Sequence, residues 1–176
     1  KENTTYTIDF SDAITDNNEG NPMGNYTFSF STGDHIDTLE VSGYCLNAEN
    51  LERIKGMLVG LYDSFEDSLF HKKPMMRVSR TNGSGRFTIK GVAPGTYRCF
   101  ALQDADGDFL FGQKSEMIAF NHDSIVPSWR PDIRQDTIWR DSLHIANILL
   151  VNYTHFLPDD ITLLCFQEPQ TDRYLL

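Results

Sequence analysis

Apolar and polar residues alternate with a period of two along much of this sequence, and turn residues interrupt the alternation at short intervals. The alternation is clearest in residues 6–10, 26–30 and 97–101. Successive side chains of a β-strand point to opposite faces, so this period is typical of strands that bury one face. Almost no segment has the 3.6-residue period of an amphipathic helix. The pattern therefore predicts an all-β fold.

Turn-forming segments divide the chain into three parts. In residues 1–34 two strands flank a connector at residues 16–22, which predicts a hairpin. Two strands alone are marginally stable in water, so this hairpin is expected to pack on another element. Residues 35–120 hold closely spaced strands with glycine-containing turns. In residues 121–176 the pattern predicts an extended wrap, that is, a segment that runs over the surface, followed by a buried strand over residues 145–153 and a strand over residues 161–166. These last elements could begin a further domain.

The first thirty or so residues resemble a known strand pattern. The sequence of residues 5–8, Asp16 with residues 20–22, and residues 26–33 look like the last strands of a bacterial Ig-like domain of the S-layer-protein type. The resemblance implies that residues 1–34 are the C-terminal hairpin of such a domain, whose earlier strands would precede them.

Residues 35–120 resemble the transthyretin-like or carboxypeptidase-regulatory-like family, which is close to the B-type repeats of bacterial adhesins. The pattern consists of Val41-x-Gly43, a strand from Gly56, Thr81 with Gly85-x-Phe87, and Val92-x-Pro94-Gly95-x-Tyr97. It implies an Ig/transthyretin-like antiparallel β-sandwich, here with extra flanking strands, used as a stalk, spacer or adhesion module. The family shares no common chemistry, and a fold alone does not establish a function.

Charge and hydropathy narrow the set of partners and locations. The formal net charge of −10 argues against nucleic acid and anionic membrane surfaces, because phosphate groups require a positive surface. No apolar run approaches the ~20 residues that cross a bilayer. The chain starts at Lys1 with strand-like residues, so we expect an export signal or lipid anchor upstream and a location in the bacterial cell envelope.

Three cysteines, Cys45, Cys99 and Cys165, stand far apart in apolar strand-like runs. Their spacing supports neither a zinc site nor a disulfide framework. A free cysteine in such a run packs as a small hydrophobe. We therefore expect core positions for all three, with a Cys45–Cys99 disulfide as the alternative.

The sharpest candidate for chemistry is Asp104-x-Asp106-Gly107-Asp108, directly after a predicted strand. Carboxylates at alternate positions of a turning backbone can converge on Ca²⁺, which takes six to eight oxygen ligands. The match to an EF-hand loop is imperfect, because the glycine stands fourth and Glu116 follows the twelfth position by one place. The alternative is a solvated acidic turn, since Asp and Gly are common turn residues. If Ca²⁺ binds, its expected role is to rigidify the loop.

Two further groups of residues are candidates for contacts with glycans. Trp129, Trp139 and Tyr153 could stack on a sugar, although burial against the core is the expected state of the two tryptophans. A recurring Asp, hydroxyl, aliphatic pattern resembles the O-glycosylation motif of some secreted bacterial envelope proteins. Its hydroxyl residues are Thr38, Ser68, Ser124, Thr137 and Ser142.

No motif indicates a catalytic site. The five histidines show no His-x-x-x-His spacing, and Gly83-Ser84-Gly85 links two strands instead of forming a nucleophile elbow. The sequence predicts a non-catalytic structural or interaction module of a secreted envelope protein, of the spacer or adhesion type. Its expected partners are neighbouring domains of the same polypeptide and an unidentified protein or glycan. The alternatives are a carbohydrate-binding module and an enzyme with an unrecognised site.

Overall fold

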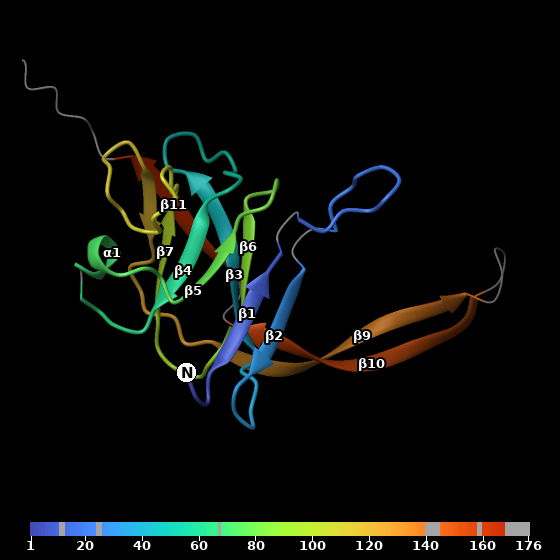
Figure 1. Ribbon diagram of the computed structural model, residues 1–176. Coiled ribbons are helices and arrows are strands. Elements are labelled where there is room, and N and C mark those ends of the chain that lie inside the picture. Colours follow the sequence, from blue (N-terminus) through green and yellow to red (C-terminus); the bar gives the residue numbers. More distant parts are fainter. Residues whose placement is uncertain (11–12, 24–25, 67, 140–144, 158–159, 168–176) are drawn as a thin grey trace, which may run out of the picture.

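The computed structural model describes residues 1–10, 13–23, 26–66, 68–139, 145–157 and 160–167, and most side chains of residues 134–157 lie outside this description. Strands hold 46% of the chain and helix 3%, which confirms the predicted all-β class. The described residues form three sheets, of which one has seven strands and two are two-stranded hairpins (Figure 1).

The seven-stranded sheet folds over itself to form a sandwich-like body. Its strand order is β5-β4-β7-β8-β11-β3-β6, and its two end strands, β5 and β6, also contact each other. The strands are β3 (Leu39–Asn47), β4 (Leu58–Tyr62), β5 (Arg77–Arg80), β6 (Arg86–Val92), β7 (Arg98–Leu102), β8 (Met117–Phe120) and β11 (Ile161–Gln167). All described pairs in it are antiparallel except β11 with β3, which is parallel.

Strand β11 joins the two halves of this sheet. Its residues from Ile161 to Cys165 pair with β3, and Phe166 and Gln167 pair with β8. The parallel pairing depends on Gly43 in β3, where an added Cβ would lie 2.2 Å from the carbonyl oxygen of Ile161. The sandwich thus includes chain from both sides of residue 120, although the division of the chain into domains stays a prediction.

The core lies between the two halves of the sheet. The predicted inward row of Tyr97, Cys99 and Ala101 is confirmed, since all three are buried there. They pack with buried side chains of the other strands, including Val41, Val59, Phe87, Ile89 and Leu163. Alternating positions of facing strands therefore meet in one apolar interior, as the period of two predicts.

A second apolar layer covers the outer face of β4, β7 and β8. It contains Phe70, Phe100, Leu102 and Phe111. The cover is the short helix α1 (Leu69–Lys72), which the predicted all-β pattern does not include, together with the segment between β7 and β8. Strand β4 is consequently buried at all of its positions.

The predicted N-terminal hairpin is confirmed as a separate two-stranded sheet of β1 (Thr5–Asp9) and β2 (Thr27–Ser31). It lies against β6 at one side of the sandwich (Figure 1). Gly91 in β6 has a φ of 70°, and an added Cβ there would lie 2.6 Å from Thr7 Oγ1. The absence of a side chain at Gly91 therefore permits the close approach of β1.

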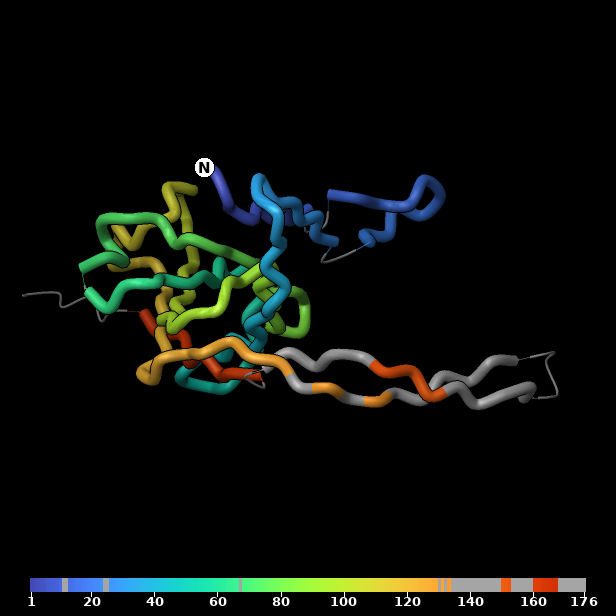
Figure 2. The backbone as a smooth tube through the Cα atoms, turned by 90° about the horizontal axis from the view of Figure 1, so that it is seen from below, coloured from blue at the N-terminus to red at the C-terminus, as the bar shows by residue number. Residues whose placement is uncertain are grey.

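Strands β9 (Ser128–Trp139) and β10 (Ile145–Leu157) form a long two-stranded arm that extends away from the sandwich (Figure 2). The expected extended wrap is thus largely a strand. The predicted burial of residues 145–153 is wrong for Leu150, which is 67% exposed. The apolar composition of β10 does not bury Leu150, because β10 pairs with β9 alone among the described strands.

Candidate functional site

The segment between β7 and β8 carries the predicted cation site. Gly107 has a φ of 81°, which glycine adopts without strain, and its N–H donates to Asp104 Oδ1 at 2.8 Å. Asp106 and Asp108 accept from backbone N–H groups of the same turn at 3.3 and 2.8 Å. These bonds wrap the chain so that one carboxylate oxygen from each of the three aspartates lies within 4.8 Å of the others. The sequence-predicted trio is therefore brought together.

Asp104 differs from the other two aspartates in its surroundings. Asp106 and Asp108 are exposed, whereas Asp104 is partly buried. Among the described side chains, Asp104 Oδ2 is the one buried oxygen that lacks a hydrogen-bond partner. Burying a carboxylate oxygen without a partner is unfavourable, and a cation would offset that cost. The side-chain nitrogen Nε2 of Gln113 donates to Asp106 Oδ2 at 3.0 Å. This hydrogen bond lowers the pKa of Asp106, which favours the charged carboxylate.

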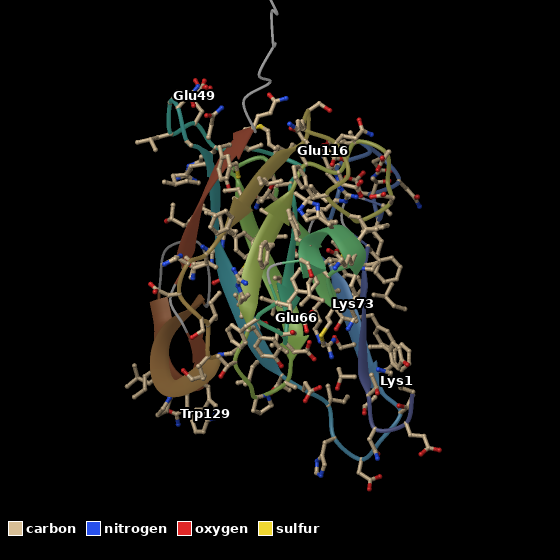
Figure 3. The ribbon with its side chains drawn as sticks, turned by 90° about the vertical axis from the view of Figure 1, so that its left-hand side faces the viewer. Lys1, Glu49, Glu66, Lys73, Glu116 and Trp129 are labelled. Carbon is tan, nitrogen blue, oxygen red and sulfur yellow. The ribbon has the colours of Figure 1, made fainter. Side chains whose placement is uncertain are left out.

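Glu116 organises this segment, a role that its displaced position relative to the EF-hand pattern does not predict. Its side chain is 1% exposed. Oε1 accepts from the N–H of Ala105 at 3.2 Å, and Oε2 accepts from Gly112 and Gln113 at 3.1 Å each. Figure 3 shows Glu116 at the top of the sandwich, beside this segment. Both carboxylate oxygens are bound by backbone donors, so Glu116 fixes the loop instead of joining the aspartate trio.

The hairpin of β1 and β2 has an unusual distribution of polar and apolar faces. Its apolar side chains, Tyr6, Ile8, Tyr26, Phe28 and Phe30, are 37–50% exposed. We call these five residues the aromatic face. The pairing places Tyr6 opposite Phe30, with ring centroids 5.5 Å apart, and Ile8 opposite Phe28. The face is thus a continuous apolar surface turned away from the sandwich.

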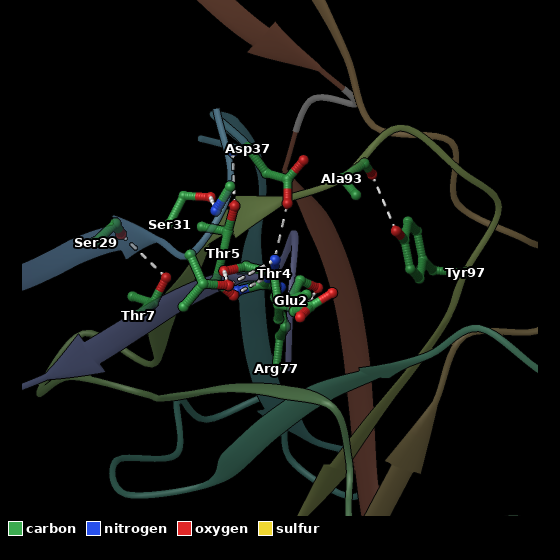
Figure 4. A network of polar contacts seen from close by, with 12 residues as sticks. Glu2, Thr4, Thr5, Thr7, Ser29, Ser31, Asp37, Arg77, Ala93 and Tyr97 are labelled. Atoms are coloured by element: carbon green, nitrogen blue, oxygen red, sulfur yellow. Dashed lines mark hydrogen bonds and ion pairs between the residues drawn. The ribbon is translucent and has the colours of Figure 1, made fainter. Parts of the chain in front are cut away.

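The opposite face of the hairpin is polar and binds the sandwich (Figure 4). Arg77 of β5 donates to the carbonyl oxygen of Thr5 at 2.9 Å and lies 3.8 Å from Asp37. The backbone N–H of Asp37 donates to Thr5 Oγ1 at 2.9 Å, and Thr7 Oγ1 lies 3.0 Å from Ser29 Oγ. The hydrogen bonds from Arg77 and Asp37 to Thr5 therefore hold the hairpin on the sandwich, while its apolar side chains stay exposed.

The predicted glycan-stacking residues are spread along the arm. Trp129 is 60% exposed, so its expected burial is wrong (Figure 3). The side chains of Trp139 and Tyr153 lie outside the described ones. Trp139 follows Trp129 by ten residues in β9, which at ~3.3 Å per residue separates their backbones by about 33 Å. A single sugar ring can therefore contact only one of the two tryptophans.

The five hydroxyl residues of the glycosylation motif have different surroundings. Thr38 and Ser124 are exposed in irregular chain. Ser68 is partly buried, and its hydroxyl accepts from Lys72 Nζ at 3.2 Å. The side chain of Thr137 and the whole of Ser142 lie outside the described residues. Of the three described side chains, those of Thr38 and Ser124 are thus the exposed ones.

The three cysteines are free and buried in the core, as the first of the two alternatives predicts. Burial raises the pKa of the Cys99 thiol. A hydrogen bond with Cys165, together with burial, raises the pKa of Cys45. The thiol form packs like a hydrophobe, which agrees with a structural role.

Comparisons with known proteins found no matching family model, no matching curated protein and no matching solved structure. No described helix has both the length and the apolar character needed to span a membrane.

Proposed function

We propose that this chain is a non-catalytic interaction module of a secreted cell-envelope protein, and that its N-terminal hairpin docks onto a neighbouring β-domain of the same polypeptide. The observation that carries this proposal is the exposure of the aromatic face. The sandwich then acts as a spacer that holds the hairpin and its partner at a fixed position.

The aromatic face has the properties of half of a β-sandwich interior. Its side chains project from alternate positions of two paired strands, as core side chains do in packed sheets. Monomeric proteins rarely expose a contiguous apolar patch unless it binds something. Because β1 and β2 pair only with each other among the described strands, their outer edges can also accept further strands. A partner sheet with an apolar face of its own would cover the aromatic face and could also pair with these strand edges.

Two features support a non-catalytic role. The cysteines, which are the strongest nucleophiles in the sequence, are buried in the core. The most buried carboxylate among the described residues, that of Glu116, is bound by three backbone donors. Both groups therefore serve the fold. The envelope location is supported by the resemblance of residues 1–34 and 35–120 to domains of surface proteins, and by the exposed positions of Thr38 and Ser124.

We propose in addition that Ca²⁺ binds Asp104, Asp106 and Asp108. The convergence of three carboxylate oxygens and the unpartnered Oδ2 of Asp104 support this site. Bound at the loop between β7 and β8, Ca²⁺ would neutralise like charges that repel each other and would rigidify one end of the sandwich.

The docking proposal is tested in the full-length polypeptide by replacing Phe28 and Phe30 with serine. If the hairpin docks on a neighbouring domain, the two domains unfold in one cooperative thermal transition, and the double variant separates the transitions. A matched control replaces Leu51, which is 62% exposed on a distant turn, with serine and leaves the transition unchanged. Identical melting curves for the native protein and the double variant would disprove docking through this face.

Carbohydrate binding is the second candidate, favoured by the exposure of Trp129. Exposed tryptophan rings stack on sugars through their apolar faces. Binding to a glycan array that is lost in Trp129→Ala would support this function. Equal binding by the native chain and Trp129→Ala, or no binding by either protein, would exclude carbohydrate binding through Trp129.

A further inference from the structure

The hydrogen bonds inside the N-terminal hairpin determine which of its backbone groups point outward. The N–H of Phe10 donates to the carbonyl oxygen of Tyr26 at 3.0 Å, and the N–H of Thr32 donates to that of Thr4 at 3.1 Å. In an antiparallel pair, residues that bond to the partner strand alternate with residues whose N–H and C=O point away from it. Both bonds join even-numbered residues, so the odd-numbered residues of β1 and β2 direct their backbone groups to the two outer edges of the hairpin.

The outer edge of β1 lies against the sandwich. The outward carbonyl oxygen of Thr5 accepts the hydrogen bond from Arg77 at 2.9 Å. Thr7 lies beside Gly91 of β6, where an added Cβ would be 2.6 Å from Thr7 Oγ1. A strand added to β1 would displace these contacts, so β2 provides the edge that a further strand can reach while the hairpin stays on the sandwich.

The outer edge of β2 is open. Its outward residues are Thr27, Ser29 and Ser31, and no described group outside the hairpin bonds to their backbone N–H or C=O. In Figure 1, β1 lies between β2 and the strands β4 and β5. Exposed strand edges are commonly protected by proline, charged side chains or bulges. Strand β2 contains no proline and no charge, and it pairs with β1 without a register shift, so its edge has none of these protections.

We infer that a strand of the neighbouring β-domain pairs with β2 through Thr27, Ser29 and Ser31 and makes the hairpin part of a larger sheet. This inference rests on the proposed docking of the hairpin, and it specifies how the partner binds. An extended chain repeats its N–H and C=O groups every two residues, about 6.7 Å apart, which matches the spacing of the three outward residues. A third strand also stabilises a hairpin that is marginal by itself.

The two faces of the hairpin define the side chains of the added strand. On one side its residues extend the aromatic face beside Phe28 and Phe30, and on the other side they extend the hydroxyl face of Thr27, Ser29 and Ser31. Successive side chains of a strand point to opposite faces. We therefore expect the partner strand to alternate between apolar residues and small polar residues.

Hydrogen exchange of single amides tests the inference in residues 1–176 and in the full-length polypeptide. In residues 1–176 the outward amides of Ser29 and Ser31 should exchange roughly tenfold or more faster than those of Phe28 and Phe30, which point towards β1. In the full-length polypeptide the amides of Thr27, Ser29 and Ser31 should slow by about tenfold or more, because the added strand accepts their hydrogen bonds.

Ser29→Pro removes the outward N–H at the middle of the edge, and proline is tolerated on the open edge of a strand. In the full-length polypeptide this variant should lose the slow exchange of Thr27 and Ser31. Ser29→Ala is the matched control, because it removes the hydroxyl that lies 3.0 Å from Thr7 Oγ1 and keeps the N–H, so it should retain slow exchange. If Ser29→Pro does not fold, the comparison of the two native proteins decides alone.

The outcomes distinguish this inference from the proposed docking. If replacing Phe28 and Phe30 with serine separates the two thermal transitions, yet the amides of Thr27, Ser29 and Ser31 exchange equally fast in both native proteins, the aromatic face docks without strand pairing and the inference is wrong. Slow exchange in the full-length polypeptide together with unchanged transitions would support strand pairing and refute docking through the face. Slow exchange that develops in residues 1–176 as their concentration rises would assign the edge to a second copy and overturn the inference.

Discussion

Arg77 and Thr5 connect the sandwich to the hairpin, because Arg77 Nη2 donates to the carbonyl oxygen of Thr5 at 2.9 Å (Figure 4). The two residues are far apart in the sequence, and the same nitrogen lies 3.8 Å from Asp37. This contact holds the polar face of the hairpin inward. The Thr5 side chain is buried and accepts from the Asp37 N–H, so the aromatic face on the other side of the strands points outward, and the proposed function depends on this feature.

Arg77→Gln should loosen the hairpin without unfolding the sandwich. The variant removes a charge-assisted hydrogen bond from a side chain that is only 19% exposed, which costs about 1.5–3 kcal/mol locally. Hydrogen exchange of the amides in β1 and β2 is expected to accelerate by roughly tenfold or more, while amides of β3 and β4 are unaffected. Arg80→Gln, on the same strand, is the control. Equal protection of the hairpin in both variants would contradict the role assigned to Arg77.

Ca²⁺ should raise the thermal stability of the chain, and Asp104→Asn should abolish the effect. A ligand at about 100 times its Kd stabilises the folded state by about 2.7 kcal/mol, which calorimetry detects as an increase in Tm. Asp34→Asn changes an exposed aspartate after β2 and should retain the full response. A Tm that is the same in Ca²⁺ and in EDTA would show that the three aspartates form only a solvated turn.

Glu116→Gln should destabilise the loop between β7 and β8 whether or not Ca²⁺ is present. An amide nitrogen would replace one of the buried carboxylate oxygens that accept backbone N–H groups, leaving a buried donor unsatisfied at a cost of ~1–3 kcal/mol. The measurement is the midpoint of urea unfolding in EDTA. Glu49→Gln, in an exposed turn, is the matched control (Figure 3). Equal midpoints for the two variants would contradict the organising role of Glu116.

Glu40 makes the fold less stable as the pH rises. Burial raises the pKa of this carboxyl, and the nearby Lys90 only partly opposes the shift. The folded state therefore retains the proton more strongly than the unfolded state, and stability decreases between the ordinary pKa of a glutamate and the raised value. Glu40→Gln should be more stable than the native chain at pH 7, by less than about 1 kcal/mol because the group is only half buried.

The difference should disappear at pH 3, where the native Glu40 is protonated in both states. Urea unfolding at the two pH values measures it, and Glu66→Gln, an exposed position, provides the control. If the stability difference between Glu40→Gln and the native chain is the same at both pH values, Glu40 is not the cause of the pH dependence.

Local periodicity predicted most of the sandwich, since the row of Tyr97, Cys99 and Ala101 and the hairpin pairing both follow from a period of two. The pattern failed where long-range pairing decides burial. Residues 145–153 are apolar enough for a core strand, yet Leu150 is exposed because β10 pairs with β9 in an arm. The parallel position of β11 beside β3 also has no local signal, because it depends on contacts more than a hundred residues apart.

The candidate sites also divide into those with a local sequence signal and those that depend on long-range contacts. The three aspartates are close in sequence, so a turn brings them together and the motif was visible. Glu116 and Arg77 were not identified, since their roles depend on backbone groups of other segments that a sequence motif does not reveal. The apolar layer over β4, β7 and β8 likewise combines residues of these strands and of α1, whose adjacency appears only in the folded sheet.

The claim that the aromatic face is covered by a neighbouring β-domain is tested most directly by a photo-crosslinking residue at Phe28 in the full-length protein in its native host. We expect the residue at Phe28 to crosslink to strands of the same polypeptide outside residues 1–176, and the same residue at Leu51 not to do so. Crosslinks from Phe28 only to a second copy of residues 1–31, or no crosslinks from a folded protein, would contradict it.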